Sequence, residues 1–172
     1  MTTIATDGIT IAADGRETRG SRVVVDGCVK IHCRHGRIYA LSGTTAMTDA
    51  VIKWHHEGAD PAKVPKTKDN DWWLVVVDKD GVWCVNADCP YLDKAELPFA
   101  TGSGHKWAEA AMLLGKGPRE AVEFAALQDL YTGGEIVEFH IATTLAGAEI
   151  ALENGLLIVP AYQTNGHAEA LQ

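Results

Sequence analysis

The sequence predicts an α+β fold in which two antiparallel β-sheets lie between layers of helices. Short apolar segments joined by Asp-Gly and similar turns fill the first forty residues and recur after residue 71. Such pairs are typical of antiparallel hairpins. Helical periodicity is confined to separate blocks and does not alternate with each strand. The chain of 172 residues, 47% of them hydrophobic, is long enough for one domain with a substantial core.

The first forty residues are expected to form an antiparallel meander. Asp7-Gly8 and Asp26-Gly27 each separate two apolar runs, which is a strong hairpin signal. A turn at His35-Gly36 precedes one further strand. The expected strands are 4–6, 9–13, 23–25, 29–33 and 38–42.

Helices and further strands are expected in the rest of the chain. Ala46, Ala50, Val51 and Trp54 recur at helical spacing before Gly58, which predicts a helix over 45–57. The polar residues that follow, with their prolines, are typical of a loop over 60–71. The remaining expected elements are strands at 72–78 and 82–86, an irregular loop at 87–97, helices at 104–114 and 118–131, a strand at 135–142, a short helix at 145–153 and a strand at 156–159.

Composition excludes several functional classes. A net charge of −8 disfavours a general nucleic-acid binder, which usually carries a basic surface. No apolar run approaches the roughly 18 residues of a membrane helix, and the first residues do not resemble a signal peptide, so we expect a cytoplasmic protein. The grouping of Cys28, His32, Cys33 and His35 lacks the spacing of a zinc site. We therefore expect no metal and no cofactor.

Six short motifs stand in a fixed order along the chain. They are Met1-Thr-Thr-Ile-Ala, Ile11-Ala-Ala-Asp-Gly-Arg16, Val29-Lys-Ile31, Leu41-Ser-Gly43, Ala100-Thr-Gly-Ser-Gly104 and Asp129-Leu-Tyr-Thr-Gly-Gly134. Together they resemble the proteasome β-subunit and HslV family of N-terminal nucleophile (Ntn) hydrolases, and the chain length is most similar to short bacterial or phage-associated HslV-like proteins. The resemblance covers roughly residues 2–142.

The resemblance implies a four-layer αββα sandwich. Residues 2–142 are expected to form the Ntn-hydrolase domain, and 143–172 a C-terminal extension that belongs to the same domain. Family members usually have a second helix after the one ending near Glu57. The short polar segment before Trp72 leaves no room for it, so we expect this helix to be missing or very short.

The chemistry of the N-terminus supports a hydrolase. A hydroxyl is a poor nucleophile until a base removes its proton. Removal of Met1 would give Thr2 a free α-amine, which titrates near pH 7.7 to 8.0 in peptides and can act as that base. A cationic Lys30 beside Thr2 would favour this deprotonation, with Asp14 holding Lys30 in place.

Further roles follow from the resemblance alone. The Gly43 N–H would point into the oxyanion hole, and Ser103, Asp129 and Thr132 would orient the α-amine and a proton-relay water. The positions that match the family's primary specificity pocket are Glu17, Cys28, His32, Leu41 and Thr45. Glu17 and His32 would favour a basic or polar residue before the scissile bond. These five residues can equally be ordinary strand residues.

The resemblance thus predicts a threonine-type endopeptidase in a self-compartmentalising homo-oligomeric ring. Its substrates would be peptides or unfolded proteins, double-ring stacking stays open, and an ATPase unfoldase partner is implied by analogy only. Two alternatives remain: a non-catalytic ring protein, and an Ntn amidohydrolase for a small amide.

Overall fold

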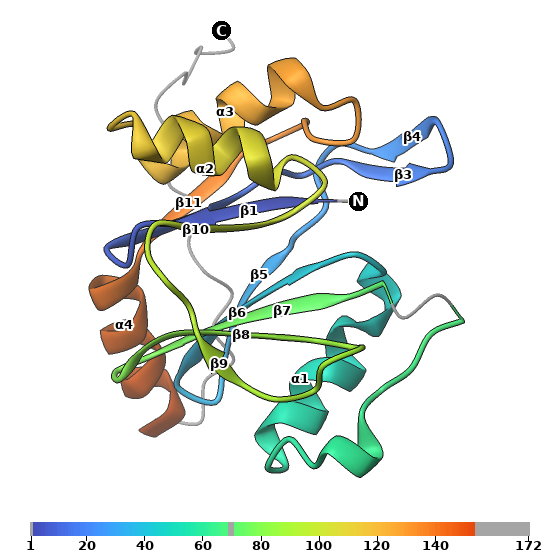
Figure 1. Cartoon of the computed structure of the whole chain (residues 1–172). Helices are drawn as coiled ribbons and strands as arrows, with labels where there is room; N and C mark the ends of the chain where they lie inside the picture. Colours follow the sequence, from blue (N-terminus) through green and yellow to red (C-terminus); the bar gives the residue numbers. More distant parts are fainter. Residues whose placement is uncertain (1, 69–70, 154–172) are drawn as a thin grey trace, which may run out of the picture.

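The computed structural model describes residues 2–68 and 71–153, and within these ranges the fold is a four-layer sandwich. Helices α2 and α3 cover one sheet, a second sheet packs beneath it, and α1 lies under the second sheet (Figure 1). The α+β class and the αββα layering predicted from the sequence are confirmed.

The first sheet carries the N-terminus and has the strand order β10-β1-β2-β11, with every pair antiparallel. Its strands are β1 (Thr3–Thr6), β2 (Thr10–Ala13), β10 (Phe99–Gly102) and β11 (Val137–His140). The expected hairpin at Asp7-Gly8 is present, because Asp7 Oδ1 accepts hydrogen bonds from the N–H groups of Ile9 and Thr10, both at 2.8 Å. This side-chain turn joins β1 to β2, and β10 pairs with the other edge of β1.

The second sheet is larger and has the order β5-β6-β7-β8-β9, again antiparallel. Its strands are β5 (Ile31–Arg34), β6 (Arg37–Ser42), β7 (Trp73–Asp78), β8 (Gly81–Asn86) and β9 (Asp93–Lys94). The segment 87–97, expected to be an irregular loop, therefore supplies a short edge strand.

One predicted hairpin is wrong. The strand Arg22–Val25 (β4) pairs with Glu17–Arg19 (β3) to form a separate two-stranded ribbon, instead of pairing with residues 29–33 across Asp26-Gly27. Long-range contacts of Asp26 explain the difference. Its carbonyl oxygen accepts a hydrogen bond from the Glu135 N–H at 2.8 Å, and its carboxylate binds Arg16 Nε at 3.0 Å. The Asp-Gly pair is thereby held against distant segments and does not close a turn.

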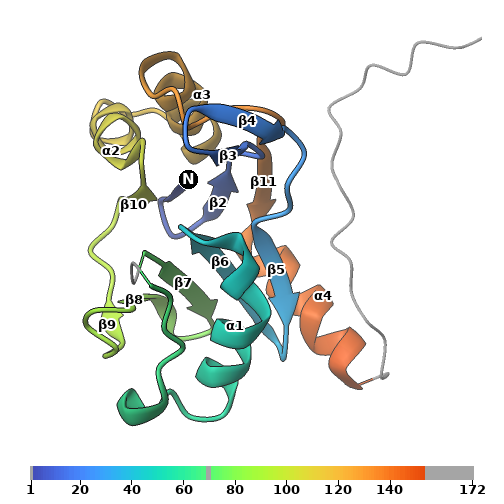
Figure 2. The same ribbon diagram turned by 90° about the vertical axis from the view of Figure 1, so that its right-hand side faces the viewer.

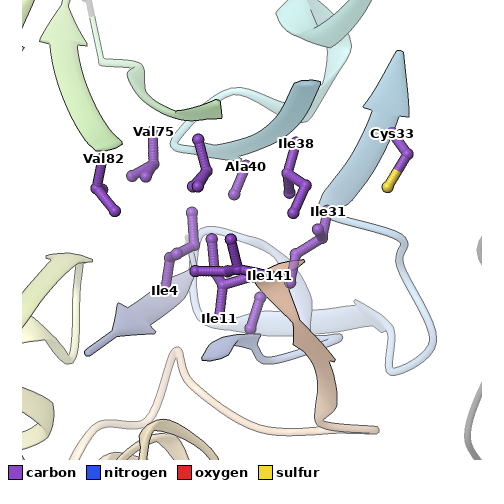
Figure 3. Packing of buried hydrophobic residues seen from close by; sticks show 11 residues of the cluster. Ile4, Ile11, Ile31, Cys33, Ile38, Ala40, Val75, Val82 and Ile141 are labelled. Atoms are coloured by element: carbon purple, nitrogen blue, oxygen red, sulfur yellow. The ribbon is translucent and has the colours of Figure 1, made fainter. Parts of the chain in front are cut away.

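The core has three parts, one for each junction between layers. Between the sheets, Ile4 and Ile11 face Ile31, Ile38 and Val75 (Figure 3). Under the second sheet, Trp54 of α1 packs edge-to-face on Trp72, with ring centroids 5.9 Å apart. Above the first sheet the cluster consists mostly of alanines, so α2 and α3 approach the strands closely.

The helices are α1 (Thr48–His56), preceded by a 3₁₀ turn η1 (Thr45–Met47), α2 (His105–Leu113), α3 (Pro118–Gln128) and α4 (Ile141–Glu153). The last begins earlier than expected and shortens the preceding strand, so the predicted boundary after residue 142 lies inside its first turn. Ile141 and Leu145 join the core between the sheets, and α4 lies alongside β5 and β6 (Figure 2). The strand expected at 156–159 lies outside the described residues.

The loop expected at 60–71 contains a 3₁₀ turn, η2 (Pro61–Lys63), and no α-helix in its described residues. Within 2–68 and 71–153, no helix has the length and apolar character needed to cross a membrane.

Candidate active site

Asp14 lies at the centre of a buried polar cluster at the end of β2. Its side chain has no exposed surface. Oδ1 accepts hydrogen bonds from Thr3 N at 2.8 Å and Lys30 Nζ at 3.0 Å, and Oδ2 accepts from Gly133 N at 2.9 Å and Arg16 N at 3.2 Å. Four donors therefore converge on one carboxyl group, and three of them come from segments distant from Asp14 in the sequence.

Lys30 is the cation of this cluster and is also buried, with 1% of its surface exposed. Its Nζ lies 3.0 Å from Asp14 Oδ1 and donates to the Arg16 carbonyl oxygen at 2.6 Å. Burial lowers the pKa of Lys30 below that of a free lysine, and the charge of Asp14 opposes this shift. Because Thr3 N and Lys30 Nζ bind the same oxygen, the cation lies close to the peptide bond between Thr2 and Thr3.

A second hydrogen-bonded chain approaches the N-terminus from α2 and α3. Thr132 Oγ1 donates to Asp129 Oδ2 at 2.6 Å and lies 2.6 Å from Thr3 Oγ1. Since the Thr132 proton is directed to Asp129, Thr3 is the donor of the bond between the hydroxyls. Thr3 Oγ1 in turn accepts from Gly104 N at 2.9 Å. The chain therefore links the start of α2 to the end of α3 through β1.

Two hydroxyl groups beside this chain have no partner. Thr2 has no exposed surface, and neither its Oγ1 nor Ser103 Oγ makes a hydrogen bond within the described structure. The backbones of these residues are nevertheless joined, since Ser103 N donates to the Thr2 carbonyl at 2.9 Å. Buried polar atoms without partners are rare in native proteins and call for an explanation. A reacting group that awaits a substrate provides one.

Two glycines allow close backbone contacts around the site, Gly102 with Thr2 and Gly43 with Asp71. Gly102, at the end of β10, has φ +96°, and a Cβ there would overlap the Thr2 carbonyl. Gly43, just after β6, has φ +97°, and a Cβ there would overlap the carbonyl of Asp71. Both positions therefore require glycine for conformation and for space.

A cavity of about 630 Å³ opens beside Thr2, between the end of β10 and the start of β7. Ser42 and Thr101 line it, and their hydroxyl oxygens lie 3.5 Å apart, one from each sheet. The other lining residues are Thr2, Gly43, Asp71, Trp73, Phe99, Ala100, Gly102, Ser103, His105 and Glu109. Three predicted catalytic residues, Thr2, Gly43 and Ser103, thus meet at one cavity.

The predicted specificity residues lie elsewhere, since none of the five lines this cavity. Cys28 lies near Lys30 and Glu17. Burial raises the pKa of its thiol, the charge of Lys30 opposes that rise, and Glu17 adds to it. Leu41, 2% exposed, packs in the core beneath the second sheet, and Thr45 begins η1.

His32 occupies β5 and is half-buried, with a buried Nε2 that has no hydrogen-bond partner among the described residues. Burial lowers its pKa, and the charge of Arg34 lowers it further. A primary specificity pocket formed by these five residues stays a prediction.

Sequence reasoning missed several residues that complete the site. Thr3 joins the two polar networks, and the Gly133 N–H donates to Asp14, although only Asp129 and Thr132 of its motif were predicted to take part. Successive side chains of a strand point to opposite faces of the sheet, so the sequence could have indicated that Thr3 and Thr2 make different contacts. Asp71 and Trp73 carry no local signal, because only the packing of β7 against Gly43 brings them to the cavity. Among the residues described, no three His, Cys, Asp or Glu side chains form a metal site.

Comparison with solved structures finds proteins of the same fold. Thiobacillus denitrificans BPH aligns with a TM-score of 0.61 at 18% identity, over 80% of this chain and 95% of that chain. Its complex with epoxomicin aligns at 0.62 and 16%, covering 80% and 96%. Eukaryotic HslV from Trypanosoma brucei aligns at 0.63 and 16%, covering 81% and 98%. By sequence, no family model and no curated protein matches this chain. The structural alignments confirm the HslV-like fold that the six motifs predict.

Proposed function

We propose that this protein is a threonine peptidase whose nucleophile is Thr2 after removal of Met1. One observation carries the proposal: Thr2 Oγ1 is buried, has no hydrogen-bond partner and borders a cavity, while the adjacent residue Thr3 is bound to the Asp14–Lys30 pair. Asp14 and Lys30 are hydrogen-bonded, whereas the hydroxyl proposed to react has no partner among the described residues.

The arrangement suits acyl transfer. The freed α-amine of Thr2 takes the hydroxyl proton while Oγ1 attacks the substrate carbonyl, and the positive charge of Lys30 favours the developing oxyanion and the deprotonated nucleophile. The Gly43 N–H is the proposed oxyanion donor, a contact worth about 10²- to 10³-fold in rate. The leaving amine accepts the proton, and water then hydrolyses the acyl-enzyme.

Ser103, Asp129 and Thr132 are the proposed groups that orient the α-amine. Thr132 and Asp129 reach the N-terminus through Thr3, and Ser103 keeps a free hydroxyl beside Thr2. A homo-oligomeric ring that encloses this site, and an ATPase unfoldase that delivers substrates to it, extend the proposal by analogy with HslV.

The experiment is intact-mass spectrometry of the purified protein before and after incubation with epoxomicin, the ligand in the Thiobacillus denitrificans complex. We expect loss of Met1 and one added inhibitor, with no adduct on Thr2→Ala. Thr6→Ala is the matched control, because Thr6 lies at the far end of β1 and its side chain forms hydrogen bonds with Gly8 and Thr10 of the adjoining turn. A processed wild-type chain that never labels would overturn the proposal and favour a non-catalytic ring protein.

The choice of substrate distinguishes a peptidase from an Ntn amidohydrolase that acts on a small amide. A peptidase should hydrolyse extended peptides faster than a short acyl amide, because side chains along the substrate add binding energy. Adduct formation together with turnover of short amides alone would indicate an Ntn amidohydrolase.

A further inference from the structure

Three of the predicted specificity residues, Glu17, Cys28 and His32, lie on segments that do not line the cavity beside Thr2. The cavity is formed by β10, the first half of α2, the end of β6 and the start of β7. Glu17 belongs to β3, Cys28 interacts with Lys30, and His32 belongs to β5. In Figure 2, β10 and α2 lie to the left of β2, and β5 lies to its right.

An extended substrate that crosses Thr2 would place residues from the two sides of its scissile bond in these two regions. If the residue before the bond faces Glu17, Cys28 and His32, the residue after it faces the cavity. At about 630 Å³, the cavity falls in the usual range of ligand sites and has room for a long side chain.

The cavity lining is acidic. It contains Asp71 and Glu109, and no lysine or arginine. Asp71 is held in position, because its Oδ1 accepts hydrogen bonds from Thr44 Oγ1 at 2.6 Å and Thr67 Oγ1 at 3.2 Å. Neither acid belongs to any ion pair within the described residues. The site therefore offers negative charge that no residue of the described ranges, 2–68 and 71–153, neutralises through an ion pair.

The remaining lining suits the aliphatic and cationic parts of a basic side chain. Phe99 and Ala100 supply apolar walls for a methylene stem. Trp73 is 42% exposed, and its ring can stack against an ammonium or guanidinium group. The hydroxyls of Thr2 and Ser103, which have no partner among the described residues, belong to the lining residues, so the proposed reacting group borders the same cavity.

We propose that this cavity is a second specificity subsite, which binds a lysine or arginine side chain on the leaving-amine side of the scissile bond. Asp71 and Glu109 bind the cation, the Trp73 ring stacks against it, and Phe99 and Ala100 contact its methylene stem. This inference rests on the proposed peptidase function, which supplies the scissile bond.

Binding without cleavage tests the subsite. Acetylated, amidated fluorescent peptides that differ at one position (lysine, norleucine or glutamate) would be titrated by anisotropy into Thr2→Ala. Norleucine keeps the lysine stem without its charge, and acetylation removes any terminal ammonium. We expect lysine to bind about tenfold more tightly than norleucine at low salt and glutamate to bind most weakly, with the difference shrinking as salt rises.

Removing the two negative charges of the cavity tests whether the preference for lysine over norleucine arises there. In the Thr2→Ala background, Asp71→Asn with Glu109→Gln should bring the lysine-to-norleucine ratio to about one. The matched control is Asp80→Asn with Glu57→Gln, which removes the same charges from exposed positions outside the cavity and should keep the ratio. Equal binding of lysine and norleucine peptides, or a preference that survives in the cavity variant, would overturn the subsite.

The proposed peptidase function is tested separately with an acyl-coumarin amide, a substrate that has no amino-acid residue after the scissile bond. Its turnover by the wild-type protein is measured. Its failure would count against the peptidase, and the anisotropy ratios would still decide the subsite.

Discussion

The polar groups on the two sides of Thr2 differ in how completely they are satisfied. On the side of β2, Asp14 and Lys30 have no exposed side-chain surface and their charged atoms are bound. On the side of β10, Thr2 and Ser103 keep hydroxyls without partners, next to the cavity. The first region, the buried Asp14–Lys30 pair, is called the closed region, because its charged groups are bound within the protein. The second region, Thr2 and Ser103 beside the cavity, keeps hydroxyls that a ligand could bind. This division separates residues that hold the site from residues that would contact a substrate.

Breaking the closed region should have the largest effect on stability. Lys30→Met leaves Asp14 buried without its cation, so we expect a loss of about 3–5 kcal/mol in the free energy of unfolding, measured by urea titration. Lys53→Met, whose side chain is 73% exposed, should change it by less than about 0.5 kcal/mol. Adding Asp14→Asn to Lys30→Met should recover part of the loss. An unchanged unfolding midpoint in Lys30→Met would contradict the comparison.

Disturbing the close contact between Gly102 of β10 and Thr2 should cause the next largest loss of stability. Gly102→Ala forces a side chain into a left-handed conformation and against the Thr2 carbonyl, whereas Gly115→Ala has a similar φ of +87° and open space around it. Both variants should lose about 1–2 kcal/mol through backbone strain. Gly102→Ala should lose at least about 1 kcal/mol more through overlap. Equal thermal unfolding shifts in the two variants would show that the approach carries no cost.

The chain through Thr132 should have an intermediate effect. Thr132→Val removes the donor to Asp129 and the acceptor for Thr3, and unsatisfied buried groups of this kind cost about 1–3 kcal/mol. Thr132→Ser keeps the hydroxyl and should retain most of the stability and the rate of epoxomicin labelling. If valine and serine behave alike, the hydroxyl has no part in the chain.

Ser103 should show the smallest stability effect and a clear effect on activity. Because its hydroxyl has no partner, Ser103→Ala should change the free energy of unfolding by less than about 0.5 kcal/mol. Labelling of Thr2 should slow by about tenfold or more if the hydroxyl orients the α-amine. A large loss of stability with unchanged labelling would reverse the assignment.

Alkaline pH offers a further test of the closed region. Since burial lowers the pKa of Lys30, the folded protein loses this proton at a lower pH than the unfolded chain does. Labelling should therefore decline in a pH range below the ordinary lysine value near 10.4. Lys30→Arg should move the decline upward, because arginine stays charged there. A pH profile of epoxomicin labelling measures both.

Two Asp-Gly pairs show how far sequence patterns could predict the fold. Asp7-Gly8 forms the expected turn because its hydrogen bonds are local, from Asp7 to Ile9 and Thr10. Asp26-Gly27 has the same signal, but Asp26 binds Arg16 and Glu135, and the latter is distant in sequence. Local turn chemistry is therefore sufficient only where no tertiary contact competes for the same groups.

The candidate site divides in the same way. The order of six motifs pointed to Thr2, Asp14, Lys30 and Ser103, and the structure brings Asp14 to Lys30 and Thr2 to Ser103. Thr3 was missed because its role depends on Gly104 and Thr132, which reach it only after α2 and α3 pack on the first sheet.

By itself, the sequence determined the α+β class, the four layers and the candidate nucleophile. Hydrophobic spacing, local turns and short motifs each depend on residues that are close together in the sequence. Only the tertiary structure decided which hydroxyls are satisfied and where the cavity opens. Those properties depend on strands far apart in the chain, as when the Asp71 backbone packs on Gly43 and Gly102 packs on Thr2. Such contacts arise from the packing of whole layers, for which no single segment carries a signal.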